Sequence, residues 1–138
     1  MKSSEFINGL FDPSAAYQYV FNDFEDGFVE ARAETKDGRP LVVEFTDDGN
    51  GVQVAFSVDS RIKLTNGGDA TRIMTTVLKI INEYCREHNP SELYFSSFDP
   101  SRSTLYRAIC TRFAKDSGFV AEVHKMSSWE TAFVLYKK

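Results

Sequence analysis

A glycine-rich turn that runs directly into a long apolar segment constrains the fold of this chain more than any other feature. The turn consists of small and polar residues, namely Asn66, Gly67, Gly68, Asp69 and Ala70. After it, apolar residues recur at helical spacing, at Ile73, Val77, Ile80, Ile81 and Tyr84. We therefore predict a helix over about 69–88, ended by Asn89-Pro90 because proline cannot continue the helical hydrogen bonds. Further apolar residues widen the stripe, so we expect this helix to be buried.

The same turn is a candidate binding site for an anion. The first turn of a helix leaves backbone N–H groups without partners inside the helix. Because Gly67 and Gly68 have no Cβ atoms, an anionic group such as a phosphate can approach these donors closely. The turn therefore predicts a phosphate site, without identifying the molecule that carries the phosphate.

The composition indicates one globular domain spanning residues 1–138, because 42% of the residues are hydrophobic and 14% are aromatic. Cys85 and Cys110 lie in apolar helical patterns, and the first ten residues lack the apolar core of a secretion leader. We therefore expect reduced thiols and a cytoplasmic location. No apolar run approaches the roughly 18 residues that a membrane span needs, so we expect no membrane insertion.

Charge is distributed unevenly along the chain. Residues 1–59 contain four Lys or Arg and twelve Asp or Glu, whereas residues 60–138 contain twelve and eight. A basic second half suits an anionic ligand, although solvated surface charge is the commoner cause of such asymmetry. The net charge of −4 and the lack of a nucleic-acid-binding motif lead us to predict no specific binding of nucleic acid. The alternative, binding to a nucleic-acid backbone, would rest on four basic residues of one predicted helix, Arg102, Arg107, Arg112 and Lys115.

Four strands are predicted before the long helix, at about 17–24, 28–35, 41–46 and 52–58. Short turns that contain glycine separate all four, the first of them at Asp26-Gly27, which is typical of an antiparallel meander. The turn at 47–51 is rich in Asp and Asn, but it lacks the distant Glu of an EF-hand calcium loop, so we interpret it as a turn. A short helix is predicted ahead of the strands, at 3–11.

The segments after the long helix predict a strand at about 92–98, a second helix and a closing hairpin of strands at about 119–126 and 130–136. Asp99 and Pro100 suit the N-cap and the first position of a helix that Ser117-Gly118 ends. Its predicted inward residues are Leu105, Tyr106, Ile109, Cys110 and Phe113, with the basic residues outside. The chain is therefore expected to have an α/β (α+β) fold, with a mixed central sheet, two main helices and a C-terminal hairpin.

This order of elements resembles the GNAT acetyltransferase fold over about residues 27–136. In that family, the glycine-rich turn after the fourth strand binds the pyrophosphate of acyl-CoA through backbone amides. The residues that resemble it here are Asn66, Gly67, Gly68, Asp69 and Ala70. Gly68 and Ala70 match the end of the family motif, whereas Thr65 stands where the family has Arg or Gln. The resemblance implies acetyl-CoA as the cofactor.

A second resemblance to the GNAT family follows the fifth strand. The family shows Asn, Ala, Leu-Tyr and Gly-Phe in this order, and the matching positions here are Asp99, Arg102, Leu105-Tyr106 and Gly118-Phe119. The resemblance implies that Tyr106 protonates the departing CoA thiolate and that Arg102 lies at the cofactor. The residues themselves leave another interpretation open, in which Tyr106 is an aromatic residue on a core-facing helix stripe.

Glu44 is our candidate for the general base that removes a proton from an amine, because burial raises the pKa of a carboxyl group on a central strand. Glu30 and Glu34 are equally available for this role. The cysteines and histidines match no recognised nucleophile motif and lack zinc-ligand spacing, so we expect structural roles for them.

Two functions remain open. GNAT enzymes usually have one or two helices between their first two strands, which help to close the acceptor pocket, and residues 17–35 leave no room for them. The chain also resembles small uncharacterised phage-borne proteins, through residues 68–73 and 101–106. We therefore expect either an acyl-CoA-dependent N-acetyltransferase or a non-catalytic binding or host-interaction module that keeps the fold. A phage-encoded chain would lie in the host cytoplasm or with the virion.

Overall fold

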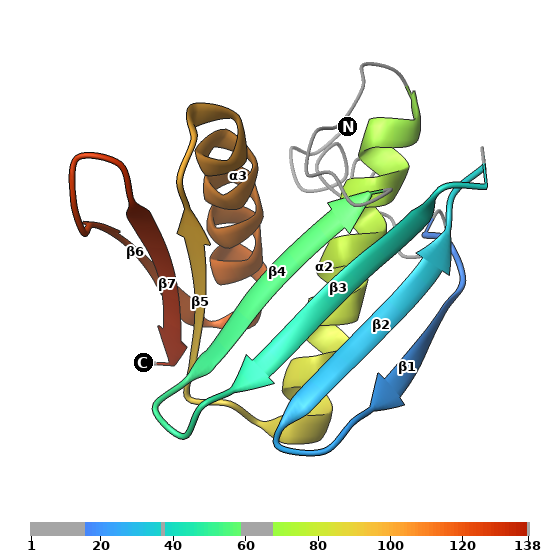
Figure 1. Cartoon of the computed structure of the whole chain (residues 1–138), viewed down its shortest axis with the longest axis horizontal. Helices are drawn as coiled ribbons and strands as arrows, with labels where there is room; N and C mark the ends of the chain where they lie inside the picture. The colour runs from blue at the N-terminus through green and yellow to red at the C-terminus, as the bar shows by residue number, and fades with distance from the viewer. Residues whose placement is uncertain (1–15, 37, 59–67, 138) are drawn as a thin grey trace.

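The computed structural model describes residues 16–36, 38–58 and 68–137. The predicted helix at 3–11 and the turn residues Asn66 and Gly67 lie outside these ranges. Within them, one mixed sheet packs against two helices, as predicted (Figure 1).

Seven strands form the sheet in the spatial order β1-β2-β3-β4-β5-β7-β6. Their bounds are Tyr19–Asp23 (β1), Phe28–Glu34 (β2), Pro40–Asp47 (β3), Val52–Val58 (β4), Glu92–Ser97 (β5), Phe119–Lys125 (β6) and Thr131–Lys137 (β7). A parallel pairing of β4 with β5 joins the antiparallel meander β1 to β4 to a second antiparallel group, β5, β7 and β6. The predicted meander and closing hairpin are confirmed.

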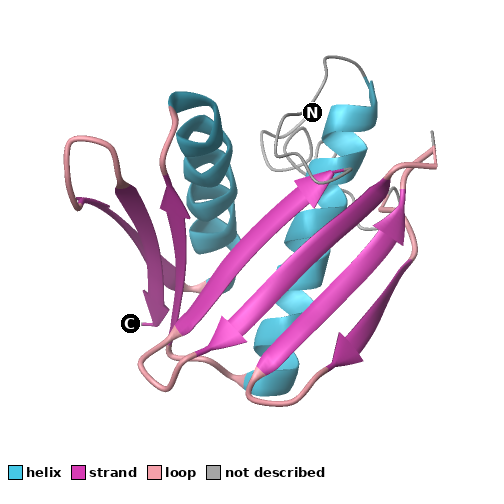
Figure 2. Ribbon diagram, in the orientation of Figure 1, coloured by secondary structure: helices cyan, strands magenta, loops and turns pink. Residues whose placement is uncertain are grey.

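Both helices, α2 (Gly68–His88) and α3 (Pro100–Ser117), lie on one face of the sheet (Figure 2). Alternate strand residues turn toward them, so that Leu41, Val43 and Phe45 of β3 are buried while Val42 and Glu44 are only half-buried. The opposite face carries no helix among the described residues. Neither α2 nor α3 is long and apolar enough to cross a membrane.

Helix α2 is buried on one side only, which differs from the expectation of a buried helix. The predicted apolar residues do face the sheet, and the ring of Tyr84 stacks on that of Phe45 with centroids 4.0 Å apart. Lys79, Asn82 and Arg86 are exposed, because α2 lies on the surface of a single sheet and no other described element covers its outer side.

Helix α3 begins and ends as predicted. The carboxylate of Asp99 accepts a hydrogen bond from the backbone N–H of Arg102 at 2.8 Å, and Gly118 ends the helix in the left-handed conformation, with φ of 80°. Four of the five predicted inward residues are buried, and Leu105 is half-buried. Arg112 differs from the prediction, because its side chain is only 10% exposed beside Asp116.

Residues 24–27 alone connect β1 to β2. Gly27 has a φ of 76°, and a Cβ atom there would lie 2.9 Å from the carbonyl oxygen of Asp47. The tight turn confirms that no helix lies between these two strands. As a result, the sheet face opposite α2 and α3 is open in the described structure.

Candidate functional site

Strands β4 and β5 separate soon after they meet. They pair at only two positions, Val52 with Leu93 and Gln53 with Tyr94, although β4 continues for five more residues and β5 for three. Their carboxyl ends therefore diverge, as Figure 1 shows. The first turns of α2 and α3 lie at the same end of the sheet as this divergence (Figure 1). Ligands of open α/β sheets bind at such carboxyl ends, where neighbouring strands part.

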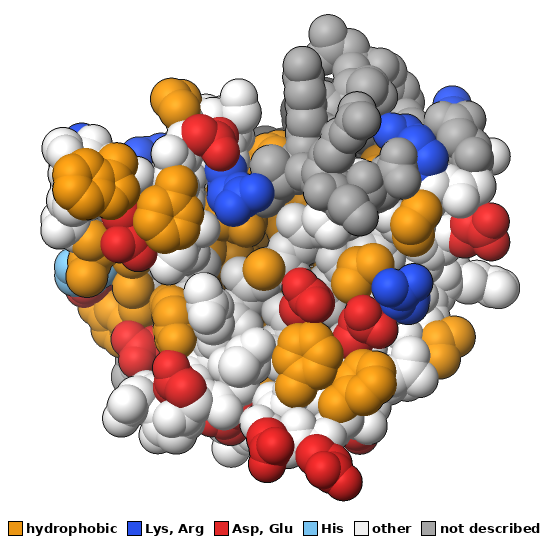
Figure 3. Space-filling view, viewed as in Figure 1, with side chains coloured by type: hydrophobic (Ala, Val, Ile, Leu, Met, Phe, Trp, Pro, Cys, Tyr) orange, Lys and Arg blue, Asp and Glu red, His pale blue; other side chains and the backbone are white. Residues whose placement is uncertain are grey.

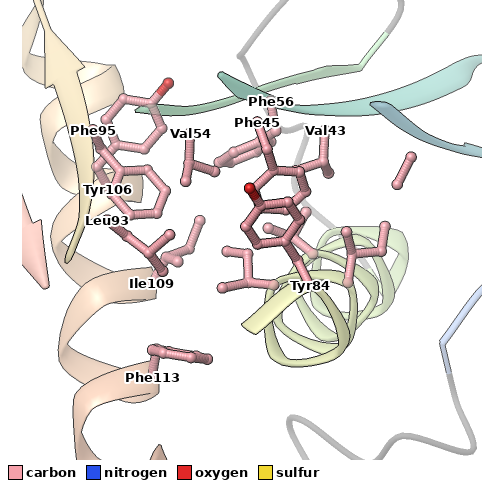
Figure 4. Packing of buried hydrophobic residues seen from close by; sticks show 14 of the residues in the cluster. Val43, Phe45, Val54, Phe56, Tyr84, Leu93, Phe95, Tyr106, Ile109 and Phe113 are labelled. Atoms are coloured by element: carbon pink, nitrogen blue, oxygen red, sulfur yellow. The ribbon is translucent and has the colours of Figure 1, made fainter. Parts of the chain in front are cut away.

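The side chain of Tyr106 lies at the divergence. Its ring contacts Phe56 of β4 at a centroid distance of 5.8 Å and Phe95 of β5 at 5.2 Å (Figure 4). A third aromatic residue, Phe133 of β7, lies 6.4 Å away. Tyr106 is only 2% exposed. An aromatic side chain from α3 thus packs between two strands at the point where their hydrogen bonds have stopped.

The environment of Tyr106 favours the protonated phenol. Burial raises its pKa above the ordinary value of 10.0, while the charge of Arg102 and hydrogen bonding from the backbone of Phe56 act in the opposite direction. Since burial is the largest of these effects, the hydroxyl keeps its proton at neutral pH. The group is therefore able to donate a proton to an anion that reaches it.

Arg102 precedes Tyr106 by about one turn of α3, and its side chain is half-buried. Its Nε atom is buried, yet no acceptor within the described part of the chain binds it. A buried donor without an acceptor costs free energy, more so when it belongs to a charged group. An anionic group bound next to Arg102 would remove this cost.

Two serine hydroxyls fix the end of β5 to the start of α3, and sequence reasoning missed them. Ser97 donates a hydrogen bond of 2.9 Å to the carbonyl oxygen of Asp99, and its hydroxyl lies 2.7 Å from that of Ser103. Ser97 is 1% exposed. A serine on the inward side of an apolar strand, next to a helix N-cap, is the signal that would have indicated this contact.

The glycine-rich turn is described only from Gly68 onward. Gly68, Asp69 and Ala70 form the first turn of α2, at the same end of the sheet as the first turn of α3, which includes Arg102 (Figure 1). Asn66 and Gly67 lie outside the described residues. The predicted cofactor residues that the structure describes thus lie at one end of the molecule.

Glu44 lies on the other side of the sheet from Tyr106. It is half-buried on the open face, opposite Glu30 of β2 and Ala55 of β4 (Figure 3 shows this face). Glu30 forms an ion pair with Arg32 at 3.1 Å, whereas Glu34 is exposed near the end of β2. The structure therefore does not bring Glu44 into contact with the Tyr106 hydroxyl, because β4 and the thickness of the sheet separate them.

The surroundings of both cysteines disfavour the reactive thiolate form. Burial raises the pKa of Cys85 to about 12 and that of Cys110 to about 12. The thiolate is the nucleophilic form of cysteine, so neither residue is activated.

Comparison with known proteins finds a family whose model matches this chain, and a solved structure with a similar fold. A family model described as "Family of unknown function (DUF6934)" matches residues 42–135, more than half of the chain. No curated protein matches the sequence. Among solved structures, the chain is similar to a chimera of the spermidine N-acetyltransferase SpeG from Vibrio cholerae and hSSAT, with a TM-score of 0.51 and 14% identity. The similarity covers 99% of this chain and 93% of that chain. At this identity the similarity shows a shared fold, here the GNAT-like fold expected from the sequence.

Proposed function

Since the chain belongs to the family of unknown function DUF6934 and has the fold of an N-acetyltransferase, we propose that it is an acyl-CoA-dependent N-acetyltransferase. The observation that carries the proposal is the divergence of β4 and β5 after two residue pairs, with Tyr106 between them. The solved chimera acts on spermidine by its name, so an amine is the proposed class of acceptor.

The proposed binding site uses the first turns of both helices. Backbone N–H groups at the start of α2, which begins at Gly68, would receive a pyrophosphate, as helix N-termini commonly do. The buried Nε of Arg102, which has no acceptor among the described residues, fits the same kind of anion and supports the proposal.

The proposed chemistry is the transfer of an acyl group from a thioester to an amine. The amine nitrogen forms a bond to the thioester carbonyl carbon, and the carbon–sulfur bond breaks. The leaving sulfur receives a proton from the Tyr106 hydroxyl, whose raised pKa keeps it protonated. The amine must also lose a proton. Glu44 is the proposed base, but it lies on the open face with β4 between it and the divergence, so water would have to carry the proton to it.

A second candidate function is a non-catalytic module that keeps the fold, with a phage-encoded origin as part of this proposal. Two observations favour it. Tyr106 is only 2% exposed, so a thiolate does not reach its hydroxyl without movement of the strands. Residues 24–27 connect β1 to β2 directly, so no helices between these strands close an acceptor pocket.

Thermal melting with and without acetyl-CoA tests the proposal, because a ligand that binds the native state raises its melting temperature. We expect a rise for the natural chain, a smaller rise for Arg102→Ala, and an unchanged rise for Lys115→Ala. Lys115 is the matched control, since it is an exposed basic residue in the last turn of the same helix. Release of free thiol in the presence of amines then measures transfer. A melting shift without transfer supports the non-catalytic module, and the absence of a shift excludes the acyl-CoA site.

A further inference from the structure

Strand β6 ends the sheet and leaves one edge open. It pairs with β7 along all seven of its residues, and no described strand lies along its other edge (Figure 1). Its sequence contains no proline and no glycine, and its residues from Ala121 to Lys125 are exposed. An open strand edge presents unpaired N–H and C=O groups to any strand of suitable sequence. The edge of β6 is therefore competent to pair with a further strand.

Apolar side chains next to this edge are exposed as well. Val123 is 47% exposed, and Met126, directly after β6, is 62% exposed. Figure 3 shows hydrophobic side chains gathered at the β6 and β7 hairpin. The edge strand β1 at the other end of the sheet is shorter, with five residues, and its only charged residue is Asp23. Of the two edges, β6 thus offers the longer strand and the more varied side chains for recognition.

We propose that two copies of this chain associate through β6, so that the two sheets continue into each other. Two identical antiparallel strands in one sheet are related by a twofold axis perpendicular to that sheet. One residue of β6 must then lie opposite itself. The proposal does not depend on the proposed enzymatic function, because the β6 edge is separate from the divergence of β4 and β5.

The side chains select one position for the axis. With Val123 on the axis, it packs against the partner's Val123, and Val120 packs against the partner's Met126. Glu122 then lies opposite the partner's His124, and this pairing occurs twice. Val123, on the helix side of β6, then meets its own copy, Val120 on the open face meets the partner's Met126, and the acidic residue meets a basic one.

The neighbouring positions of the axis are unfavourable. An axis at Glu122 places two carboxylates opposite each other, and like charges directly opposite destabilise a sheet. An axis at His124 places Glu122 opposite the partner's Met126. Glu122 is already held in place within one copy, because the hydroxyl of Tyr136 donates a hydrogen bond to it and the Nε2 atom of His124 lies 3.0 Å from it. The carboxylate is therefore ordered for the contact before association.

Single cysteines test the position of the axis under oxidising conditions. Val123→Cys should form a disulfide between copies, because residues directly opposite in antiparallel strands have Cα atoms about 4.5–5.5 Å apart, within disulfide range. Glu122→Cys should not, because its own copy lies about 8 Å away, two positions along the strand. Disulfide formation at Glu122→Cys in preference to Val123→Cys would overturn the register. Formation at Val20→Cys of β1 instead would move the contact to the other edge.

Two substitutions at one exposed position test the charge pairing. His124→Lys should strengthen the association, because it places a full positive charge opposite the partner's Glu122, and His124→Glu should weaken it by repulsion. Sedimentation at about 100 µM protein measures both, since this concentration populates interfaces of micromolar affinity. Circular dichroism confirms that each variant is folded. A natural chain that sediments as a monomer, or equal association of both variants, would refute the proposal.

Discussion

The carboxylate of Asp48 accepts a hydrogen bond of 2.6 Å from the hydroxyl of Tyr94. Asp48 lies in the turn between β3 and β4, and Tyr94 lies on β5 at one of the two positions where β5 pairs with β4. The hydrogen bond therefore joins β5 to the β3–β4 turn where β4 and β5 are still paired, whereas Tyr106 packs where they have separated. The sequence predicts a turn at 47–51 and not a calcium loop. In the structure, Asp48 of this turn binds Tyr94 of β5.

Removal of this hydrogen bond should weaken the fold most near neutral pH. The hydrogen bond from Tyr94 is the largest cause of the lowered pKa of Asp48, followed by the backbone of Asn50. A lowered folded-state pKa contributes stability above the unfolded value of 3.8, and this stability disappears as the pH falls through the folded value. Tyr94→Phe should therefore be less stable than the natural chain near neutral pH, and the difference should shrink in acid.

Denaturant unfolding over an acidic to neutral pH series measures this difference. Asp48→Asn is the control, because an amide does not titrate. In that background, Tyr94→Phe should show no such dependence on pH. A difference between Tyr94→Phe and the natural chain that stays constant from neutral to strongly acidic pH would contradict the assignment.

Gly27 should tolerate alanine less well than Gly49. Both residues have positive φ, 76° and 89°, but a Cβ atom on Gly27 meets the carbonyl oxygen of Asp47 at 2.9 Å, whereas nothing lies within 4 Å of one on Gly49. Gly49→Ala is expected to cost about 1 kcal/mol from backbone strain alone. Gly27→Ala should cost at least about 1 kcal/mol more, measured by denaturant unfolding. Equal costs would show that the turn adjusts without strain.

Tyr106→Phe separates chemistry from packing. If Tyr106 is the acid, acetyl transfer should fall roughly 10²-fold while the acetyl-CoA melting shift is unchanged. If it has only a packing role, the substitution leaves any acetyl transfer unchanged, and the variant loses about 1 kcal/mol of unfolding free energy with its hydroxyl contact. Steady-state transfer assays and unfolding experiments on the same preparations distinguish the two. Transfer at the natural rate in the variant would exclude Tyr106 as the acid.

Gly68→Val tests the first turn of α2. In the proposed site, the branched side chain blocks the backbone donors, so the acetyl-CoA melting shift should be lost while the melting temperature without ligand changes little. If the glycine only forms the turn, the natural chain shows no shift. The substitution then destabilises the fold by about 1–3 kcal/mol.

Both cysteines should resist alkylation in the native state. Burial raises the pKa of Cys85 and of Cys110 to about 12 in each case, so almost no thiolate exists at mildly alkaline pH. Iodoacetamide followed by mass spectrometry should leave both unmodified until denaturant is added. Rapid modification of Cys110 in the folded protein would show that α3 opens locally.

Local patterns predicted the elements but not the contacts between them. Glycine turns and alternating residues gave the four strands of the meander, and Asp99 with Gly118 fixed the ends of α3 to within one residue. The divergence of β4 and β5 escaped prediction, because it depends on packing among Phe56, Phe95 and Tyr106, which are far apart in the sequence. No local pattern reports where two distant strands stop pairing.

The candidate site was predicted in part for the same reason. Tyr106 and Arg102 were selected by resemblance; the ring of Tyr106 packs at the divergence, and Arg102 lies about one turn earlier on α3. The depth of Tyr106, and the lack of an acceptor for the Nε of Arg102 among the described residues, depend on tertiary packing. Glu44 was selected as a carboxylate on a central strand, without regard to the face of the sheet on which its side chain lies.

The short junction between β4 and β5 also bears on the order of events during folding. The meander and the C-terminal hairpin close through short turns, so each nucleates at little entropic cost. The junction instead joins Gln53 to Tyr94 across the whole of α2, and loop-closure entropy delays such contacts. The two antiparallel halves are therefore expected to form first and to dock at the transition state, where Asp48 and Tyr94 meet. Mutational effects at this pair should then appear mainly in the folding rate.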